Sequence, residues 1–322
     1  AWTYDQASDS YWTPSKSTPA YVASGEEQIY RYSEAKYTVN DLKTNPANAN
    51  GCWIYDKVNW RIYMRFKVAK NPKDADLNVS FVNELLNLGA ANWVVVDGLK
   101  FQFGGTGVKI NAGSDNWITM CMFRNCGAGV EVYKPEAKNN VIQYCDLADS
   151  MVTSWAWSFV KATYYERSAI DFSAGWGNIA RYNVIKCFFN GIGAGIWDKL
   201  YDEAYNGDVD AYGNDIEDTN DDSWEPEGTC MNTRFFKNRI SKVFHPISLA
   251  PITIGPSYVI YNTFDGFSGG SGAYKLNVAP PDDPNKVLDG YIYIYHNTAY
   301  TENPDNNAFS IYEGVPYSRI KF

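Results

Sequence analysis

The chain has 322 residues, and its composition excludes several classes of function. A formal net charge of −9 opposes binding to nucleic acid and to anionic lipid surfaces. No apolar run approaches the roughly 18 residues that a membrane-spanning helix needs, so we expect no membrane span. Aromatic residues make up 16% of the chain. Strand propensity accounts for most of the tyrosines, and the surplus favours sugar binding.

Residues 1–92 differ from the rest of the chain because they carry no regular spacing. The stretch GCWIYDKVNWRIYMRF (51–66) has two aromatic, alternating runs joined by a polar turn, which predicts a β-hairpin. We expect this aromatic-rich N-terminal segment to cap the open end of the structure that follows, because an uncovered strand edge invites aggregation.

From Trp93 onward, a spacing of 24 residues organises the sequence. Short runs of alternating apolar residues flank each marked position, which predicts strands, and a fixed period predicts stacked units. Three short strands with bends use about 24 residues, and stacked coils lie about 4.8 Å apart. We therefore predict an all-β fold, a right-handed three-sided parallel β-helix over 93–322, rather than a β-sandwich of evenly spaced strands. The marked positions are Trp93 and Trp117; Asp97, Cys121 and Cys145; and Asn214, Asn238 and Asn262.

These marked residues should point into the coils. Asparagine suits an inward ladder, because its amide can bond the same amide in the coils above and below. Cys121 and Cys145 fall at ladder positions and are interpreted as small core residues. The six cysteines include no Cys-x-x-Cys pair, so a zinc site is not expected.

Three insertions interrupt the period, near 148–167, 197–207 and 266–287. Insertions in repeat proteins form loops that often wall the binding face. Aromatic and charged residues crowd the first two, so Trp155, Trp157 and Trp197 are candidates for stacking on a sugar, and Glu166 for binding it.

A pair made of a small and an apolar residue recurs in successive coils, as in Gly129-Val130 and Ala169-Ile170, and sets the register. If the apolar residue points inward, the next residue points outward. This predicts an outward column of Glu131, Asp171, Gly193, Glu225 and Ser248. A flanking column two residues before the inward position holds Ser168, Asn190, Asp222 and His245.

The segment 219–228, TNDDSWEPEG, holds the densest chemistry in the chain. Asp222, Glu225 and Glu227 can act as acid and base, because a neighbouring charge raises one pKa and leaves the other group ionised. Carboxyl groups about 5.5 Å apart suit retaining glycoside hydrolysis, and 6.5–9.5 Å suits inversion. His245 could bond Asp222 from the next coil, and Asp171 should contact substrate in the same groove. The plain alternative is a solvated acidic turn.

The acids also permit a calcium site, with Asp208, Asp210 and Asp221 as candidate ligands. The stretch 206–222 does not match an EF-hand loop, since no Glu stands at the twelfth position. With calcium bound, Lys161 or His245 could serve as the base of a polysaccharide lyase. The alternative for Lys161 is a solvated loop charge.

The coil pattern resembles the secreted right-handed parallel β-helix proteins of carbohydrate metabolism, the pectate-lyase-like superfamily. NDDSWEPEG, HPISLAP and GPSYVIYN, together with WSFVK and Glu166, resemble bacterial β-helix repeat proteins more specifically. The resemblance implies a β-helix and a secreted or cell-surface location. Asp221-Asp222 matches the acidic pair of polygalacturonase-like enzymes, but His245 stands in Phe-His-Pro instead of Gly-His-Gly, which argues against galacturonan hydrolysis.

Two classes of function remain. The first is an enzyme, and we expect a monomer that cleaves a polysaccharide by hydrolysis, because an acidic groove repels uronates and accepts a neutral glycan. The second is a non-catalytic, cellulose-binding adhesin, similar to the tapirins, that binds through exposed Trp and Tyr. The clustered acids favour the enzyme.

Overall fold

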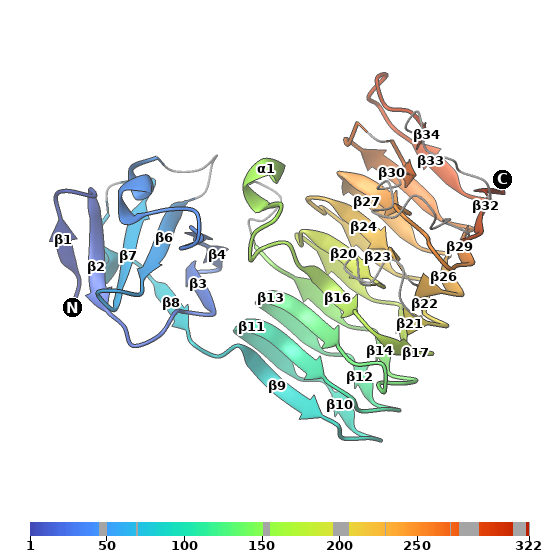
Figure 1. Cartoon of the computed structure of the whole chain (residues 1–322), viewed down its shortest axis with the longest axis horizontal. Coiled ribbons are helices and arrows are strands. Elements are labelled where there is room, and N and C mark those ends of the chain that lie inside the picture. Colours follow the sequence, from blue (N-terminus) through green and yellow to red (C-terminus); the bar gives the residue numbers. More distant parts are fainter. Residues whose placement is uncertain are drawn as a thin grey trace, which may run out of the picture.

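The computed structural model describes residues 1–44, 50–68, 70–150, 155–195, 206–228, 230–270, 272–276, 290–311 and 320–321. Within these residues the chain is all-β and built mostly from long parallel sheets, one of them strongly curled (Figure 1). The helices described are short: α1 (Trp157–Val160) and two 3-10 turns, η1 (Val39–Lys43) and η2 (Pro72–Asp74).

A nine-stranded parallel sheet takes one strand from each coil. Neighbours in this sheet come from consecutive coils, so the coils stack as the period predicts. Its strands, in order, are β10 (Val95–Asp97), β12 (Trp117–Thr119), β14 (Val141–Gln143), β18 (Ile179–Arg181), β22 (Asp210–Tyr212), β26 (Thr233–Phe236), β29 (Ser257–Ile260), β32 (Ile292–Tyr295) and β35 (Ile320–Lys321).

A fifteen-stranded sheet holds two further runs of strands, joined where β11 (Lys100–Ile110) and β13 (Met122–Val132) each extend through both runs. One run contains β15 (Asp146–Ala148), β19 (Val184–Lys186), β23 (Asp215–Glu217), β27 (Arg239–Val243), β30 (Thr263–Phe267) and β33 (Thr298–Tyr300). The other contains β9 (Glu84–Gly89), β16 (Ser168–Phe172), β20 (Asn190–Gly193), β24 (Asp222–Glu225), β28 (His245–Ser248), β31 (Tyr274–Leu276) and β34 (Phe309–Ile311). A small third sheet holds β17 (Gly175–Trp176), β21 (Asn206–Gly207) and β25 (Cys230–Met231).

The expected asparagine ladder is confirmed. The side-chain amide of Asn214 donates to the Asn238 carbonyl at 3.0 Å, and the Asn238 amide donates to Asn262 at 3.1 Å. The same bonds extend the ladder to Asn183 below and Asn297 above. Each carbonyl also accepts the backbone N–H of the coil below, as Asn238 does for Asn214 at 2.9 Å. The ladder therefore satisfies buried backbone and side-chain groups together.

The register of the first coil differs from the 24-residue spacing. Val95, not Trp93, pairs with Trp117, and Asp97 pairs with Thr119 instead of aligning with Cys121. The first step is thus two residues shorter. A shift of two preserves which side chains face inward, so the strand survives, but Trp93 falls in a turn and is 77% exposed.

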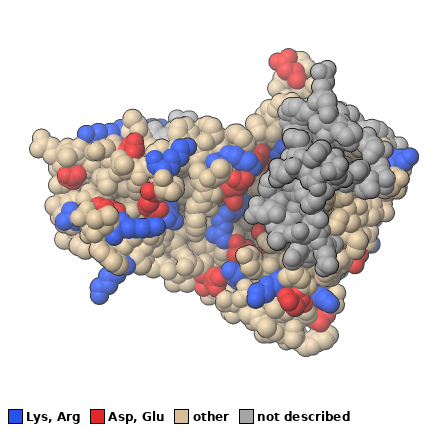
Figure 2. All heavy atoms as spheres, in the orientation of Figure 1, with Lys and Arg blue, Asp and Glu red and all other residues tan. Residues whose placement is uncertain are grey.

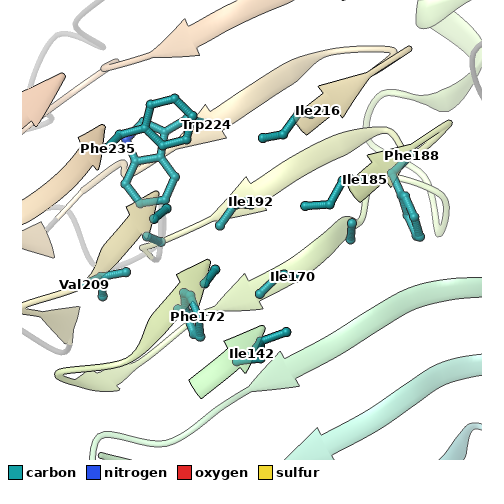
Figure 3. Packing of buried hydrophobic residues seen from close by; sticks show 14 of the residues in the cluster. Ile142, Ile170, Phe172, Ile185, Phe188, Ile192, Val209, Ile216, Trp224 and Phe235 are labelled. Atoms are coloured by element: carbon teal, nitrogen blue, oxygen red, sulfur yellow. The ribbon is translucent and has the colours of Figure 1, made fainter. Parts of the chain in front are cut away.

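Apolar side chains from the strands fill the interior of the coils (Figure 3). Ile170, Ile192, Trp224 and Ile247 stack in register and are fully buried, as the small-apolar pairs predict. The Trp224 ring also stacks on Phe235 from another face of the coil, at 5.0 Å between centroids. Each such side chain contributes roughly 2 kcal/mol of burial free energy.

Residues 1–80 form an N-terminal lobe with its own sheets, and the predicted hairpin, β6 (Gly51–Asp56) with β7 (Arg61–Phe66), is confirmed there. The lobe also contains β1 (Thr3–Asp5), β2 (Ser10–Pro14), β3 (Tyr21–Ser24), β4 (Glu27–Gln28), β5 (Tyr30–Arg31) and β8 (Leu77–Ser80). It lies beside α1 and contacts β11 and β13 (Figure 1). The side chain of Val95, in the first strand of the nine-stranded sheet, is not covered by the lobe and is 64% exposed.

The parallel stack begins at β9, before the expected boundary at residue 93. The step from Val141 to its partner Ile179 spans 38 residues, 14 more than the period. Most of the predicted insertion at 197–207 and much of that at 266–287 lie outside the described residues. The right hand of the coil, its three-sided section and the capping role of the N-terminal lobe stay predictions.

Candidate active site

The outward column of the second run has the predicted register. Glu131 pairs with Asp171, Asp171 with Gly193, and Gly193 with Glu225. The flanking column is also in register, with Ser168 beside Asn190 and Asp222 beside His245. Short parallel strands separated by about 4.8 Å therefore bring together carboxyl groups that lie far apart in the sequence.

A cavity of about 780 Å³ lies over this column. Glu225 and Glu227 line it, as do the predicted substrate-binding residues Asp171 and Glu166. A second hollow of about 360 Å³ shares Asp171 and Glu131 with the first and continues toward the first coils. The structure thus brings four of the predicted site residues to one cavity.

Asp222 and His245 do not line this cavity, contrary to the expectation of an open groove. Asp222 is fully buried and His245 is 5% exposed. Asp222 and His245 pair with each other two residues before the inward Trp224 and Ile247, and residues 157–161 cover this part of the coil: Trp157 stacks over Phe244 at 6.3 Å, and Lys161 reaches Asp221. A Cβ at Gly269 would lie 2.2 Å from His245 Nε2, so the ring is enclosed there too.

Glu225 and Glu227 each accept one hydrogen bond from a neutral donor. The Asn190 side-chain amide donates to Glu225 Oε2 at 2.7 Å, and the Ser248 hydroxyl donates to Glu227 Oε1. Burial raises the pKa of Glu225 well above its usual range, and the carboxylates of Glu227 and Asp222 raise it further. Burial raises the pKa of Glu227 to about 7, while Lys275 limits the rise. Glu227 is therefore poised to exchange protons near neutral pH, and burial with its acidic neighbours favours the protonated form of Glu225.

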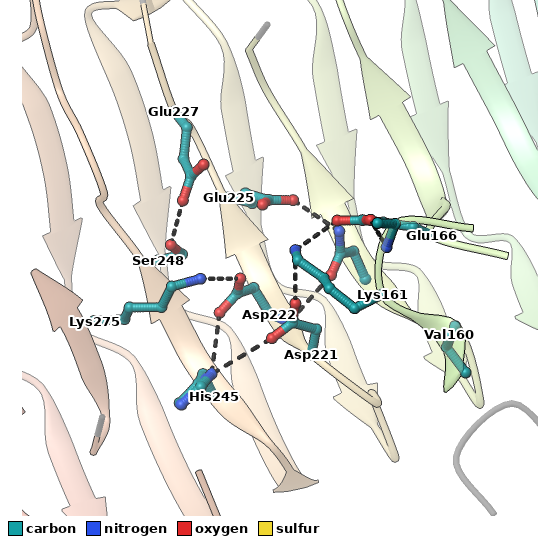
Figure 4. Close-up of polar contacts among 12 residues, drawn as sticks. Val160, Lys161, Glu166, Asp221, Asp222, Glu225, Glu227, His245, Ser248 and Lys275 are labelled. Carbon is teal, nitrogen blue, oxygen red and sulfur yellow. Dashed lines mark hydrogen bonds and ion pairs between the residues drawn. The ribbon is translucent and has the colours of Figure 1, made fainter. Parts of the chain in front are cut away.

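Two lysines balance the aspartates below the cavity (Figure 4). Lys161 Nζ lies 3.1 Å from Asp221 Oδ2 and 2.5 Å from Glu166 Oε1. Lys275 Nζ lies 2.9 Å from Asp222 Oδ2. Burial lowers the pKa of Lys161, but Asp221 and Glu166 outweigh it and hold this pKa above its usual value. Lys161 is therefore charged. Because it is paired with Asp221 and Glu166, it is not a freely solvated loop residue.

His245 faces both aspartates. Its Nδ1 lies 3.4 Å from Asp222 Oδ1 and 3.6 Å from Asp221 Oδ1. Burial lowers the pKa of His245, but the two carboxylates outweigh burial and raise it overall. The predicted contact between the coils is present, and it belongs to the buried charge network rather than to the cavity wall.

Lys275 is the site residue that the sequence reasoning missed. It follows Ala273-Tyr274, a small-apolar pair of the same kind as those that set the register, and Ser248 pairs with Lys275. The signal was therefore present, but the third insertion lengthens this coil and hides the spacing. Asn190 and Ser248 were placed in the columns without a role; they are the donors to the two glutamates.

The predicted calcium ligands are not brought together. Asp210 forms an ion pair with Arg234 in the nine-stranded sheet, and Asp208 accepts from Asn232, whereas Asp221 binds Lys161 on the other face. Asp222, Glu225 and Glu227 do place oxygen atoms within 4.8 Å of one another. Lysine, asparagine and serine donors already bond one oxygen of each, so this set fits a lysine-balanced carboxylate cluster better than a calcium site.

The tryptophans predicted to stack on a sugar lie in different environments. Trp155 is 3% exposed and packs against Tyr30 and Tyr165, so it belongs to a core and cannot stack on substrate. Trp155 comes before α1 and packs on the N-terminal lobe, whereas Trp157 opens α1, so the sequence alone does not show which of the two is exposed. Trp157 is 39% exposed, and Trp197 lies outside the described residues.

Charge on the visible face of the molecule is mixed, with acidic and basic side chains interspersed (Figure 2). Among the described helices, none has the length and apolar character required to cross a bilayer. Comparison with models of protein families, with curated proteins and with solved structures found no match.

Proposed function

We propose that the protein is a secreted or cell-surface enzyme that cleaves a neutral polysaccharide by hydrolysis. The observation that carries this proposal is a close carboxyl pair, Glu225 and Glu227, at the wall of a 780 Å³ cavity. We also propose the detailed fold: a right-handed, three-sided parallel β-helix of pectate-lyase-like type, acting as a monomer. Stacked parallel sheets with an internal asparagine ladder support it.

The separation of the two carboxyl groups favours a retaining mechanism. One oxygen of each lies within 4.8 Å of the other, which is below the 6.5–9.5 Å that leaves room for an inverting water. Glu225, the more strongly neutralised acid, donates its proton to the glycosidic oxygen as the bond to the leaving sugar breaks. Glu227 attacks the anomeric carbon and forms a glycosyl ester. Glu225 then takes a proton from water, which hydrolyses the ester.

The supporting residues fit these roles. Ser248 and Lys275 stabilise the ionised form of Glu227, which a nucleophile requires. Asn190 fixes Glu225 Oε2 and leaves the other oxygen to carry the proton. Lys161 and His245 act below the cavity by balancing Asp221 and Asp222.

Hydrolysis is favoured over elimination by the state of Lys161. A base for elimination must be neutral, whereas Asp221 and Glu166 keep this ammonium charged. The acidic cavity wall also repels a uronate carboxylate, and a neutral glycan meets no such penalty.

The test is incubation with a panel of neutral and acidic polysaccharides, with assays for new reducing ends and for the ultraviolet absorbance of an unsaturated uronate. We expect reducing ends without absorbance, and their loss in Glu225→Gln. Glu217→Gln is the matched control, because Glu217 is ion-paired to two lysines on the other run of the sheet. New absorbance would identify a lyase. Binding to insoluble cellulose without any product would instead identify an adhesin.

A further inference from the structure

The 155–167 segment reaches the candidate active site but is too short to hold itself in place. It carries Lys161, which contacts Glu166 of the same segment and Asp221 of the coil. Its only described helix is α1, a single turn of four residues, and isolated helices below about 12 residues are marginal in water. Contacts outside the segment must therefore fix where Lys161 lies.

Several of these contacts come from the N-terminal lobe. Tyr30 is central among them, because its hydroxyl donates to the Phe159 carbonyl at 2.5 Å. Its ring lies 5.1 Å from the Trp155 ring and 5.6 Å from that of Tyr165. Trp155, Val160 and Tyr165 share one buried cluster with Tyr30 and other residues of the lobe. The apolar side of the segment is thus buried in the lobe.

Tyr165 fastens the other end of the segment. Its hydroxyl accepts the Arg31 backbone N–H at 2.6 Å and donates to the Ile29 carbonyl at 3.2 Å, so it bonds the lobe at the edge of β5. The neighbouring Tyr164 hydroxyl donates to the Ala20 carbonyl at 3.1 Å. Lys161 lies between the Phe159 and Tyr165 attachments and projects to the opposite side, toward Asp221 (Figure 4).

We propose that the N-terminal lobe is part of the candidate active site, in which Tyr30 and Tyr165 are positioning residues that set Lys161 over Asp221. Anything that loosens the lobe displaces the ammonium from the carboxylates. The fastening stands on the contacts alone, whereas its effect on turnover rests on the proposed function.

The first experiment needs no activity. Tyr30→Phe removes the hydroxyl that holds Phe159, and Tyr165→Phe is the second variant. Tyr32→Phe is the matched control, because this buried tyrosine lies in the same cluster but its hydroxyl donates to Thr44 inside the lobe. We expect hydrogen exchange in peptides covering 155–167 to quicken roughly fivefold or more in the two test variants, the usual effect of losing one hydrogen bond, and to stay unchanged in Tyr32→Phe. Equal exchange in Tyr30→Phe, Tyr165→Phe and the control would overturn the proposal.

The second experiment reads the effect on the site. Tyr30→Phe should lower kcat by roughly tenfold with KM nearly unchanged, within the hundredfold cost of a misplaced group. The pH–rate profile should move to higher pH, as in Lys161→Met, because Lys161 lowers the pKa of both glutamates. The double variant should be no slower than Lys161→Met alone. Additive losses would mean that Tyr30 acts without Lys161 and would overturn the positioning role. If the unmodified protein cleaves nothing, the exchange experiment still decides the fastening.

Discussion

The asparagine ladder and the carboxylate column cross the same coils in the same register, but they are built differently. In the ladder, each coil from Asn183 to Asn297 repeats one residue, and each amide bonds the next. In the column, the outward residue changes at every coil, from Glu131 through Asp171, Gly193, Glu225 and Ser248 to Lys275. We interpret a residue that repeats in a fixed register as one that stabilises the fold. We interpret a position whose residue changes from coil to coil as one that can serve chemistry.

The physical reason lies in how each set offsets burial. A ladder amide replaces its lost water contacts with an identical partner above and below. A column carboxylate has no identical partner that helps, since a second carboxylate repels it and raises its pKa. Burial of the column carboxylates therefore lowers the stability of the fold, whereas the ladder amides raise it.

The largest expected effect separates the two sets by activity. Glu225→Gln should lower turnover by at least about a hundredfold, the scale of general acid–base catalysis, while substrate binding persists. Because the folded-state pKa of Glu225 is raised, ionisation costs stability as pH rises above its usual value. The variant should therefore be at least as stable as the unmodified protein at neutral pH in urea unfolding. If the variant lost stability as well as turnover, Glu225 would have a structural role like that of the ladder residues.

The second effect is on stability alone. Asn238→Ala removes a donor to Asn262 and the acceptor of two Asn214 groups, all buried. We expect the free energy of unfolding to fall by about 3 kcal/mol. Asn59→Ala, which loses only an exposed side-chain bond to Asp56, should change it by less than about 0.5 kcal/mol. Equal losses in the two variants would contradict the role of the ladder.

A third variant asks whether a buried acid is enough to indicate chemistry. Asp149 accepts the Tyr21 hydroxyl at 2.7 Å, away from the cavity, and burial raises its pKa to about 7. The folded state then binds more protons than the unfolded state between about pH 4 and pH 7, so stability falls as pH rises through this window. Asp149→Asn should remove about 4 kcal/mol of that fall and leave turnover unchanged.

The measurement is urea unfolding across the same pH range, with Asp146→Asn at the surface of the coil as control. An unchanged pH dependence in Asp149→Asn would show that this carboxyl group is not neutralised in the folded protein. A loss of turnover would extend the chemistry beyond the column.

The smallest effect tests a donor inside the column. Ser248→Ala removes the hydroxyl that lowers the pKa of Glu227, so this pKa should rise and the acidic side of the pH–rate profile should move up. We expect turnover at neutral pH to fall roughly threefold, as for one hydrogen bond, and to recover at higher pH. Ser241→Ala, a buried serine of β27 whose hydroxyl has no hydrogen-bond partner among the described residues, should leave the profile in place. A uniform loss at all pH values would contradict the assignment.

The sequence was sufficient for the features that repeat. The parallel stack, the ladder of Asn214, Asn238 and Asn262, and the alignment of Glu225 with Asp171 all depend on local alternation and constant spacing. Strand pairing converts these local signals directly into three-dimensional neighbours.

Features that depend on one non-repeating segment were not predictable in this way. Asp222 and His245 pair in the flanking column as expected, yet residues from the first insertion cover them. Trp155 looks like a platform in the sequence and is a core residue because the N-terminal lobe packs on it. These contacts link residues 60 positions apart, as for Lys161 and Asp221, or 125 apart, as for Tyr30 and Trp155, and no regular spacing predicts them.

The steps between coils vary in length but not in rise. Val141 and Ile179 are 38 residues apart and Ile179 and Asp210 are 31, yet each pair lies on adjacent strands, as do residues 24 apart. Hydrogen bonding fixes the rise at about 4.8 Å whatever the coil contains. For protein engineering, this means that a loop can be exchanged for a longer or shorter one without altering the spacing of the carboxyl groups.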